Sequence, residues 1–476
     1  MPRLAGNRAT ETEGNETRPS IVASIVRRPA FLILVSKSEY VPILKLSSLL
    51  LILALAVACV TGGDPSQKSA ETIKQPAEKD DRDVSAGGPT LEQPAAAASL
   101  AQTSRTEKRN VALIHLESTR AQSVTPYNRD VKTTPFLDEL AKRSLLAEHA
   151  YTVVPHTFKA SVSVNCGIEP NLGQENTEAK PNGIPVPCLT SLLKDQGYVT
   201  VFLQSSTKDL DNFEDLVKNF GYEEFYPLES MSTESFQQVS SFSYEDNIML
   251  KPSEEWLREH KDKSFVAEYR TGAGYYDYQC VPNRYGSENF SDVDKLNSYL
   301  NCLRYQDFFV KNLIDQYKEL GLYDNTIFVI FGDHGEGFGE HGRYQHDDTI
   351  YEEGLKVPLI IHAPGWFPNG ERVKGLSNHT DILPTVLEML GYEVKNGSYP
   401  GYSLLHSLPE ERTLRFSCFH ESKCLASIQG SEKYIYHYGD QPDELFDLSE
   451  DPLEKRNLAN ESGNQGTDQQ LDESPV

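Results

Sequence analysis

The sequence has few basic residues for its length. Its 476 residues include 45 Lys and Arg against 70 Asp and Glu, which gives a formal charge of −25. A protein that binds the backbone of a nucleic acid needs a basic face to neutralise the phosphates. The composition therefore argues against nucleic acid as a partner, although it leaves room for a local basic pocket.

The sequence also has no Cys-x-x-Cys pair, which argues against a zinc ribbon. Apart from Cys59, the cysteines fall into neighbours along the chain: Cys166 with Cys188, Cys280 with Cys302, and Cys418 with Cys424. Sequential disulfide bonds of this kind suit an oxidising compartment. Buried free thiols are the alternative, because sequence alone does not fix connectivity.

One apolar run, at residues 44–63, has the length of the apolar core of a signal peptide and is short for a spanning helix. It ends in Ala-Val-Ala-Cys, which is similar to a bacterial lipoprotein cleavage box with Cys59 as the lipidated residue. The alternative is a single N-terminal anchor helix over roughly residues 41–60. Both alternatives predict an extracytoplasmic protein, in the periplasm or at the cell surface, that is tethered to a membrane.

Composition divides the rest of the chain. After an N-terminal segment at 1–59, residues 60–108 are poor in apolar side chains and predict a disordered linker, as does the tail at 461–476. Residues 109–400 alternate apolar strand-like runs with helical patterns and form the expected main domain. Residues 401–460 contain short strand-like runs and predict a small C-terminal subdomain.

The main domain has the pattern of an α/β fold. Apolar runs that predict strands lie at 110–118, 199–204, 325–331 and 357–361, and patterns that predict helices lie at 133–151, 188–196, 297–321 and 380–391. Nearly continuous apolar strands between helices predict a mostly parallel central sheet with helices on both faces. The C-terminal runs predict antiparallel strands.

Two of these strands end in side chains that suit a metal. The first is followed by Glu117, and the strand before the glycine-rich stretch FGDHGEGFGEHGRYQH (331–346) is followed by Asp333 and His334. The carboxyl ends of parallel strands meet at one edge of a sheet, where ligands bind. Carboxylates and imidazole suit zinc, manganese or magnesium. A polar turn that holds no metal is the alternative.

A nucleophile is available in the segment Pro-His-Thr-Phe-Lys. A Thr157 alkoxide is able to attack a phosphorus or sulfur centre, and Lys159 would neutralise the developing charge. His156 would help to position the donor. The alternatives are a helix-capping threonine and a structural histidine.

Residues 110 to about 457 resemble the sulfatase branch of the alkaline phosphatase superfamily. The resemblance is carried, in order, by NVALIHLES, TTPFLDELAKRS, CLTSLLKDQGYVT, YLNCLRYQDF, TIFVIFGDHGEGFGEHG, NHTDILPTVLEMLG and DELFDLSEDPLEKRNLA. It implies a metal-binding turn at 333–342. It also implies that Glu117, Thr157, Asp333 and His334 bind the metal and that Thr157 is the nucleophile.

The same resemblance assigns roles to several further histidines. It places His346 where related enzymes have a substrate-contacting basic residue, with His341 as a weaker candidate. His379 and Asp381 correspond to a second-metal region of the phosphatase relatives. A cap on the helix that follows is the preferred reading of these two residues.

The active-site pattern departs from that of ordinary sulfatases. They have Cys or Ser within Cys/Ser-x-Pro-x-Arg and convert it to formylglycine, whereas threonine cannot give that aldehyde. The threonine and the Leu-Glu-Ser segment at 116–118 look like those of lipoteichoic acid synthases and phosphoethanolamine transferases. Those relatives also have a multi-helix membrane domain, while the C-terminal segment of this chain is similar to that of soluble sulfatases.

We therefore expect a metal-dependent extracytoplasmic phosphotransferase or phosphodiesterase with one divalent metal (Mn, Zn, Mg or Ca). Its substrate would be a phosphate or sulfate ester, such as a lipid head group or a cell-surface glycan. The alternatives are a sulfuric ester hydrolase (sulfatase) of the same fold and a non-catalytic binding lipoprotein.

Overall fold

The computed structural model describes residues 97–173, 175–419, 424–439 and 441–459. All of them belong to one compact unit. The predictions for the N-terminal segment with Cys59, for most of the linker and for the C-terminal tail lie outside these residues. Within the described part of the chain, no helix combines the length and the apolar character needed to cross a membrane.

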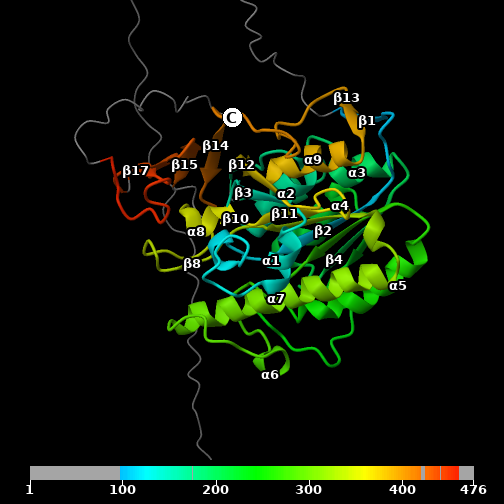
Figure 1. Ribbon diagram of the computed structural model, residues 1–476, viewed down its shortest axis with the longest axis horizontal. Coiled ribbons are helices and arrows are strands. Elements are labelled where there is room, and N and C mark those ends of the chain that lie inside the picture. Colours follow the sequence, from blue (N-terminus) through cyan, green and yellow to red (C-terminus); the bar gives the residue numbers. More distant parts are fainter. Residues whose placement is uncertain (1–96, 174, 420–423, 440, 460–476) are drawn as a thin grey trace, which may run out of the picture. The chain divides into compact units, whose positions relative to one another are not determined.

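A nine-stranded sheet forms the centre of the fold (Figure 1). Its order is β10-β3-β11-β7-β2-β6-β4-β5, and β12 also pairs with β3. The pairs among β7, β2, β6, β4 and β5 are parallel, while β11 runs antiparallel to both of its neighbours. The strands are β2 Asn110–Leu116, β3 Leu145–Tyr151, β4 Val199–Gln204, β5 Glu224–Tyr226, β6 Phe265–Arg270, β7 Thr326–Gly332, β10 Lys356–Val357, β11 Leu359–His362 and β12 Glu371–Asn378.

Helices cover both faces of this sheet, as the sequence predicts. One apolar cluster packs α2, α3, α4 and α9 on one face, and a second packs α1, α5 and α7 on the other (Figure 1). The helices are α1 Pro135–Ala141, α2 Thr157–Cys166, α3 Leu189–Lys194, α4 Phe213–Phe220, α5 Leu250–His260, α6 Pro282–Tyr285, α7 Asp294–Glu319, α8 Glu352–Leu355 and α9 Ile382–Met389. The α/β prediction is confirmed.

The two strands that lead to the predicted metal ligands are direct neighbours. β2 and β7 pair in parallel with Leu116 opposite Gly332, and β6 pairs with the other side of β2 with Arg270 opposite His115. Every residue of the three strands is buried, which explains their continuous apolar character. The residues that follow β2 and β7 therefore emerge at the same edge of the sheet.

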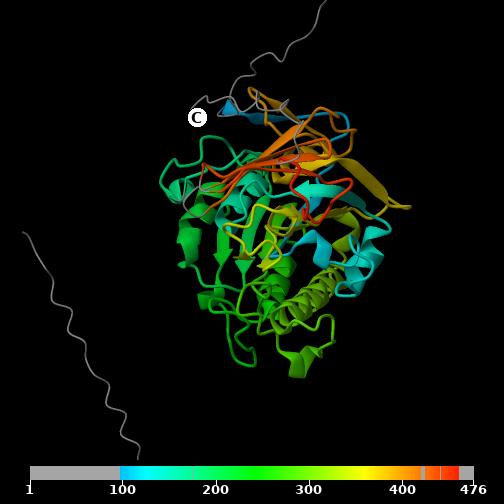
Figure 2. The same cartoon turned by 90° about the vertical axis from the view of Figure 1, so that its left-hand side faces the viewer.

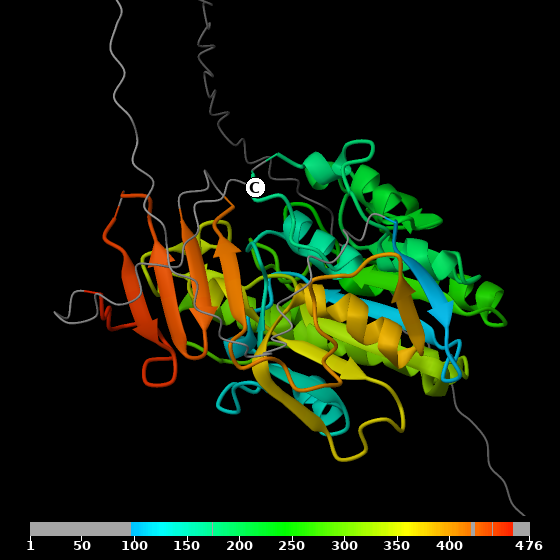
Figure 3. The same cartoon turned by 90° about the horizontal axis from the view of Figure 1, so that it is seen from above.

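The predicted C-terminal strands form a four-stranded antiparallel sheet. The order is β14-β15-β16-β17, with bounds Thr413–Ser417, Leu425–Gln429, Glu432–Tyr436 and Glu444–Asp447. These orange-to-red strands lie side by side in Figure 3, and Figure 2 shows them on a different side of the central strands from α7. Their apolar side chains pack against Tyr151, Ile350 and Leu355 of the main domain.

The helix predicted over 133–151 is wrong in its second half. The helix α1 ends at Ala141, and residues 145–151 form β3. Leu, Ala and Glu favour a helix on their own, but this segment supplies the strand that pairs with β10, β11 and β12. Pairing with three strands outweighs a weak local propensity.

The linker prediction fails for its described end. Residues Ser99–Gln102 form β1, which pairs antiparallel with β13 (Tyr392–Lys395). Leu100 packs against the core cluster that includes α9. This strand forms through its pairing with β13, which composition averaged over the whole stretch does not detect. The remaining short strands are β8 Gly337–Phe338 and β9 Tyr344–Gln345.

The sequential pairing of the cysteines is confirmed. The three disulfide bonds join Cys166 to Cys188, Cys280 to Cys302, and Cys418 to Cys424. The first ties the end of α2 to the start of α3, so the helix that begins with Thr157 is held covalently at its far end.

Candidate active site

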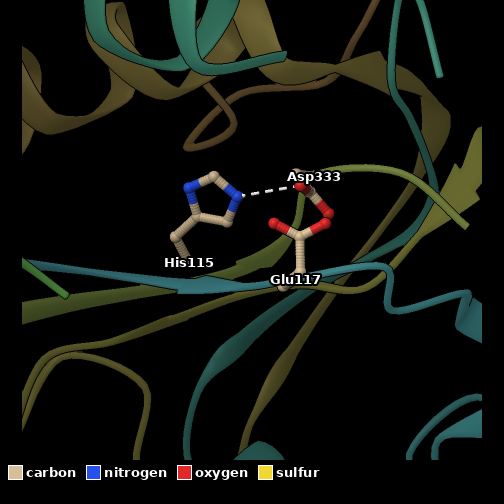
Figure 4. Close-up of side chains that lie close together, drawn as sticks. All are labelled: His115, Glu117 and Asp333. Atoms are coloured by element: carbon tan, nitrogen blue, oxygen red, sulfur yellow. Dashed lines mark ion pairs between the residues drawn. The ribbon is translucent and has the colours of Figure 1, made fainter. Parts of the chain in front are cut away.

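Glu117, Asp333 and His334 meet at the carboxyl edge of the sheet. The carboxylates of Glu117 and Asp333 lie side by side above β2 and β7, with the His115 ring beside Asp333 (Figure 4). His334 Nε2 lies 3.5 Å from Glu117 Oε1 and 3.4 Å from Asp333 Oδ2. The structure therefore brings the three predicted metal ligands together.

Thr157 completes this group from another element. It is the first residue of α2, and its Oγ1 lies 3.1 Å from Glu117 Oε1 and 3.1 Å from His334 Nε2. His156 is the N-cap residue, but its side chain makes no capping hydrogen bond. Thr157 thus points its hydroxyl at the carboxylate and the imidazole. We call Glu117, Thr157, Asp333 and His334, together with His115, the edge cluster.

His115 is a member that sequence reasoning missed. It lies inside β2, fully buried, with Nε2 3.0 Å from Asp333 Oδ2 and Nδ1 3.7 Å from Glu268 Oε1. Burial opposes a proton on the ring, but Asp333 and Glu268 outweigh it and raise the pKa of His115. The polar residue within the apolar run NVALIHL was the available signal for a buried role.

The edge cluster brings two carboxylates together in a buried place. Burial by itself would raise the pKa of Asp333, yet His334 and His115 hold it well below its usual range. Burial would likewise lower the pKa of His334, but Asp333 and Glu117 raise it to about 10. The two buried carboxylates thus favour a proton on the neighbouring imidazoles, and a divalent metal is also able to balance their charge.

The donor atoms fit such a metal. Asp333 Oδ1 accepts from the backbone N–H groups of Ser118 and His334, whereas Oδ2 is buried and faces the rings of His115 and His334. The backbone therefore fixes the orientation of this carboxylate, and its other oxygen points into the cluster of candidate ligands. Carboxylate, imidazole and hydroxyl donors suit zinc, manganese or magnesium.

The glycine-rich turn allows close packing of the backbone at this site. A Cβ atom on Gly335 would lie 1.9 Å from the carbonyl oxygen of Glu353. The backbone N–H groups of Gly335 and Glu336 donate to the carbonyls of Gly354 and Glu353. This glycine is thus needed for an approach to α8, which anchors the turn directly after His334.

His346 lies beside the edge cluster, as predicted. Its ring stacks on His334 with 4.1 Å between centroids, and its Nδ1 lies 3.3 Å from Glu336 Oε2. Tyr275 packs near the other side of the ring, at 5.7 Å between centroids. His346 therefore stands next to the predicted nucleophile and ligands.

Lys159 has partners of its own within the protein. Its ammonium group is buried and forms an ion pair with Glu178 Oε2 at 3.0 Å, and it also donates to the carbonyl of Glu175. These partners occupy the group that was expected to meet the substrate. The partner, Glu178, comes from the short 3-10 helix Thr177–Ala179, which the local sequence around Thr157 gives no means of identifying.

A buried arginine lies closer to the ligands. Arg270, at the end of β6, has its Nε 3.8 Å from Glu117 Oε2. Sequence reasoning missed it, because one arginine in the run FVAEYR carries no motif. Its only signal is its place at the end of an apolar strand.

The His156 side chain contacts residues outside the edge cluster. Its ring stacks on Phe419 at 3.6 Å between centroids, and its Nε2 lies 3.8 Å from Asp211 Oδ2. Phe419 follows Cys418 of the third disulfide bond. Burial, together with the neighbouring His346 and His334, holds the pKa of His156 well below its usual value. The C-terminal subdomain thus reaches the residue that precedes the predicted nucleophile.

His341 belongs to a separate group, which we call the turn cluster: His341, Glu353 and Glu454. His341 Nδ1 lies 2.6 Å from Glu353 Oε1. Glu454 is paired with the buried Lys433, at 2.7 Å. This cluster joins the glycine-rich turn to the C-terminal subdomain.

His379 and Asp381 have structural partners. Asn378 caps the turn that begins at His379, and Asp381 closes the capping box and pairs with Arg412 at 2.7 Å. His379 Nε2 lies 2.8 Å from the Gly332 carbonyl. The reading as a helix cap is confirmed for Asp381 through its capping box with Asn378, whereas the His379 side chain contacts the Gly332 carbonyl and forms no cap.

The comparisons with known proteins agree with this architecture. The sulfatase family model matches residues 109–392, and the model for the C-terminal region of N-sulphoglucosamine sulphohydrolase matches residues 339–474. The first match covers more than half of the chain, so the chain belongs to the sulfatase family of the alkaline phosphatase superfamily.

Curated relatives fall into two kinds. The lipoteichoic acid synthase-like protein YvgJ of Bacillus subtilis is 25% identical over 62% of this chain and 50% of its own length. The Delta 4,5-hexuronate-2-O-sulfatase of Bacteroides thetaiotaomicron is 23% identical over 74% of this chain and 85% of its own length. The chain thus spans about half of the lipoteichoic acid synthase relatives it matches.

Solved structures share the fold. The lipoteichoic acid synthase LtaP of Listeria monocytogenes has a TM-score of 0.61 at 18% identity, covering 74% of this chain and 89% of that one. The putative sulfatase yidJ of Bacteroides fragilis has a TM-score of 0.61 at 20% identity, covering 76% and 93%. The fold is therefore common to enzymes of both kinds.

Proposed function

We propose that the chain is a metal-dependent phosphotransferase or phosphodiesterase in which Thr157 is the nucleophile. The observation that carries the proposal is the position of Thr157 Oγ1, 3.1 Å from both Glu117 Oε1 and His334 Nε2. A hydroxyl in that place has an acceptor for its proton and lies among the residues that would hold a cation.

In the first half-reaction, Thr157 Oγ1 forms a bond to the phosphorus of the donor, and the bond from phosphorus to the donor's alcohol oxygen breaks. The Thr157 proton passes toward Glu117 Oε1, its nearest carboxylate acceptor, and ends on the departing alcohol. The intermediate is a phosphoryl ester of Thr157, which keeps the second alcohol when the donor is a diester. In the second half-reaction, water or an acceptor hydroxyl attacks its phosphorus, takes the phosphoryl group with that alcohol, and restores the Thr157 hydroxyl. His346 contacts the anionic group beside the edge cluster.

Glu117, Asp333, His334 and Thr157 would hold the divalent metal. Such an ion, when bound, lowers the pKa of a hydroxyl and balances charge on phosphoryl oxygens. His115 and the backbone N–H groups around Asp333 orient that carboxylate, which is the supporting role that neighbours of metal ligands commonly have.

The test is the intact mass of the protein with peptide mapping after incubation with manganese and a panel of phosphodiester and sulfate-ester donors. The expected result is an adduct on the peptide that contains Thr157, with the mass of the donor's phosphoryl group and its retained alcohol. The variant Thr157→Ala should fold and lack the adduct. A matched control is Thr190→Ala, a buried threonine whose hydroxyl binds the Phe220 carbonyl outside the edge cluster. Turnover of phosphodiesters by Thr157→Ala at the wild-type rate would overturn the proposal.

Sulfate ester hydrolysis is the second candidate. It is favoured by the long match to the Delta 4,5-hexuronate-2-O-sulfatase and by the matching C-terminal region of N-sulphoglucosamine sulphohydrolase. Against it stands Thr157, which does not give formylglycine. Release of sulfate without an adduct on Thr157 would select this candidate. Metal binding without turnover of any donor would select the binding lipoprotein instead.

The cellular setting belongs to the same proposal. Three disulfide bonds suit an oxidising compartment, so we place the enzyme outside the cytoplasm, tethered by its N-terminal segment. The substrate would be a phosphate or sulfate ester on a lipid head group or a cell-surface glycan. Membrane fractionation of Cys59→Ser against wild type distinguishes lipid attachment, which the variant loses, from a single anchor helix, which it keeps.

A further inference from the structure

Arg270 has a position that the chemistry described above does not use. The side chain lies at the end of β6, next to β2, and is only 2% exposed. Its guanidinium approaches Glu117 at 3.8 Å, and Glu117 in turn accepts from the Thr157 hydroxyl. A fixed positive charge therefore stands one side chain away from the predicted nucleophile.

The guanidinium is held firmly but its donors are only partly used. Nη2 donates to Ser206 Oγ at 3.1 Å, and the group lies over the Phe213 ring at 4.1 Å. Nε and Nη1 are buried and donate to no described residue. A buried charge with unused N–H groups is costly, and the distant contact with Glu117 offsets only part of that cost.

Lys159 offers the opposite case within the same site. Its ammonium group is also buried, but it has three oxygen partners from Glu178 and Glu175 within 3.2 Å. Of Lys159 and Arg270, the arginine is therefore the one with buried N–H groups that donate to no described residue. Guanidinium is also the group whose planar fork matches two oxygens of a phosphate or sulfate.

We propose that Arg270 binds the tetrahedral oxyanion at this site, with the Nε and Nη1 N–H groups donating to its non-bridging oxygens. The inference rests on the proposed function only in placing the central atom of that oxyanion opposite Thr157 Oγ1. It replaces the role expected of Lys159. The ligand chemistry is the same for a phosphate ester, a sulfate ester and the free inorganic anions.

The first experiment measures binding of inorganic phosphate and of inorganic sulfate to the full chain by titration calorimetry, in manganese-containing buffer. Arg270→Gln should weaken the binding of the preferred anion by about 10- to 100-fold, because it removes hydrogen bonds from a charged donor. Arg270→Lys keeps the charge but not the fork, and should lose at least about fivefold. The matched control is Arg258→Gln, an exposed arginine on α5, which should bind as wild type.

A purely structural role predicts a different pattern. Arg270→Gln would then lower the midpoint of thermal unfolding while leaving the anion dissociation constant within about twofold of wild type, and that result overturns the proposal. If Arg270→Gln fails to fold, Arg270→Lys decides: reduced affinity supports the proposal and unchanged affinity overturns it.

The binding assay also separates this proposal from the proposed function. Thr157→Ala should still bind the anion, because Arg270 is intact. If no donor gives a Thr157 adduct but Arg270→Gln loses anion binding, the oxyanion site stands and the nucleophile assignment fails. If the adduct forms and Arg270→Gln binds the anion as wild type, only the Arg270 assignment fails. The phosphate and sulfate arms show which ester the site prefers.

Discussion

The edge cluster and the turn cluster contain the same kinds of side chain at the two ends of one glycine-rich turn. In the turn cluster, the negative charge of Glu454 faces the ammonium of Lys433, which is fully buried and also lies 3.3 Å from Glu352. In the edge cluster, no lysine is among the described partners, and the carboxylates face imidazoles and a partly paired arginine instead. The turn cluster therefore has a buried ammonium group to balance its carboxylates, whereas the edge cluster has the arrangement that we propose for a divalent metal.

The largest expected effect concerns the metal site that we propose at the edge cluster. Asp333→Asn should weaken manganese binding by at least about 100-fold, because it removes a charged donor whose neighbours hold it in place. Titration of the metal-free protein with manganese measures this. The control Asp315→Asn changes an exposed carboxylate on α7 that pairs with Lys311 and should bind as wild type. Unchanged affinity in Asp333→Asn would remove the edge cluster as the metal site.

Lys433 provides the next test, in the turn cluster. Lys433→Met leaves Glu454 and Glu352 without their cation in a buried place, so the free energy of unfolding should fall by about 3–5 kcal/mol. Urea unfolding measures this. Lys311→Met, which breaks an exposed ion pair on α7, should cost less than about 1 kcal/mol. Similar losses of unfolding free energy in both variants would mean that Lys433 does not stabilise the turn cluster.

A third test uses pH on the metal-free protein. The folded pKa of His334 is raised to about 10 from an ordinary value of 6.5, so its stabilising proton is fully present below pH 6.5 and is lost as the pH rises through 10. Stability should fall over that interval by up to a few kcal/mol, since one pKa unit corresponds to about 1.36 kcal/mol. Urea unfolding at several pH values, with chelator, measures it.

His334→Gln should remove most of that alkaline loss, and saturating manganese should suppress it in the wild type. An equally steep loss in the variant would assign the pH dependence to other groups.

The smallest expected effect concerns His341. His341→Gln removes a hydrogen bond to Glu353 at the edge of the turn cluster and should lower the free energy of unfolding by about 1 kcal/mol. Manganese affinity should stay as in wild type. If instead the variant binds less manganese, the turn cluster holds a second metal and its resemblance to the edge cluster extends to function.

The site residues whose positions were predictable from the sequence are those that directly follow a predicted strand. Glu117, Asp333 and His334 come immediately after apolar strands, and parallel neighbours bring such positions to one edge whatever else the fold contains. The roles of Lys159 and Arg270 were not predictable in this way. Each depends on a partner brought from elsewhere in the chain: Glu178 for the lysine, and Ser206 with Phe213 for the arginine.

The strands also divide into those that were predictable from the sequence and those that were not. Strands that are apolar almost throughout, such as β2 and β7, were recognisable from the sequence. A strand that is buried on both faces of the sheet has apolar residues at nearly every position. β3 was not recognisable, because its Leu-Leu-Ala-Glu-His-Ala-Tyr sequence suits a helix and only its pairing partners make it a strand. β1 is a strand only through its register with β13.

The contact between Phe419 and His156 joins the C-terminal subdomain to the residue before Thr157. Phe419 stands in a hairpin connection between β14 and β15 that is closed by its own disulfide bond, while the chemical groups stand on the central sheet. Phe419 lies outside the pairing of β14 with β15, so a substitution there leaves both that pairing and the acidic centre in place. Under the proposed function, selectivity for one ester over another is thus able to change through the C-terminal subdomain, while the proposed nucleophile and ligands stay the same.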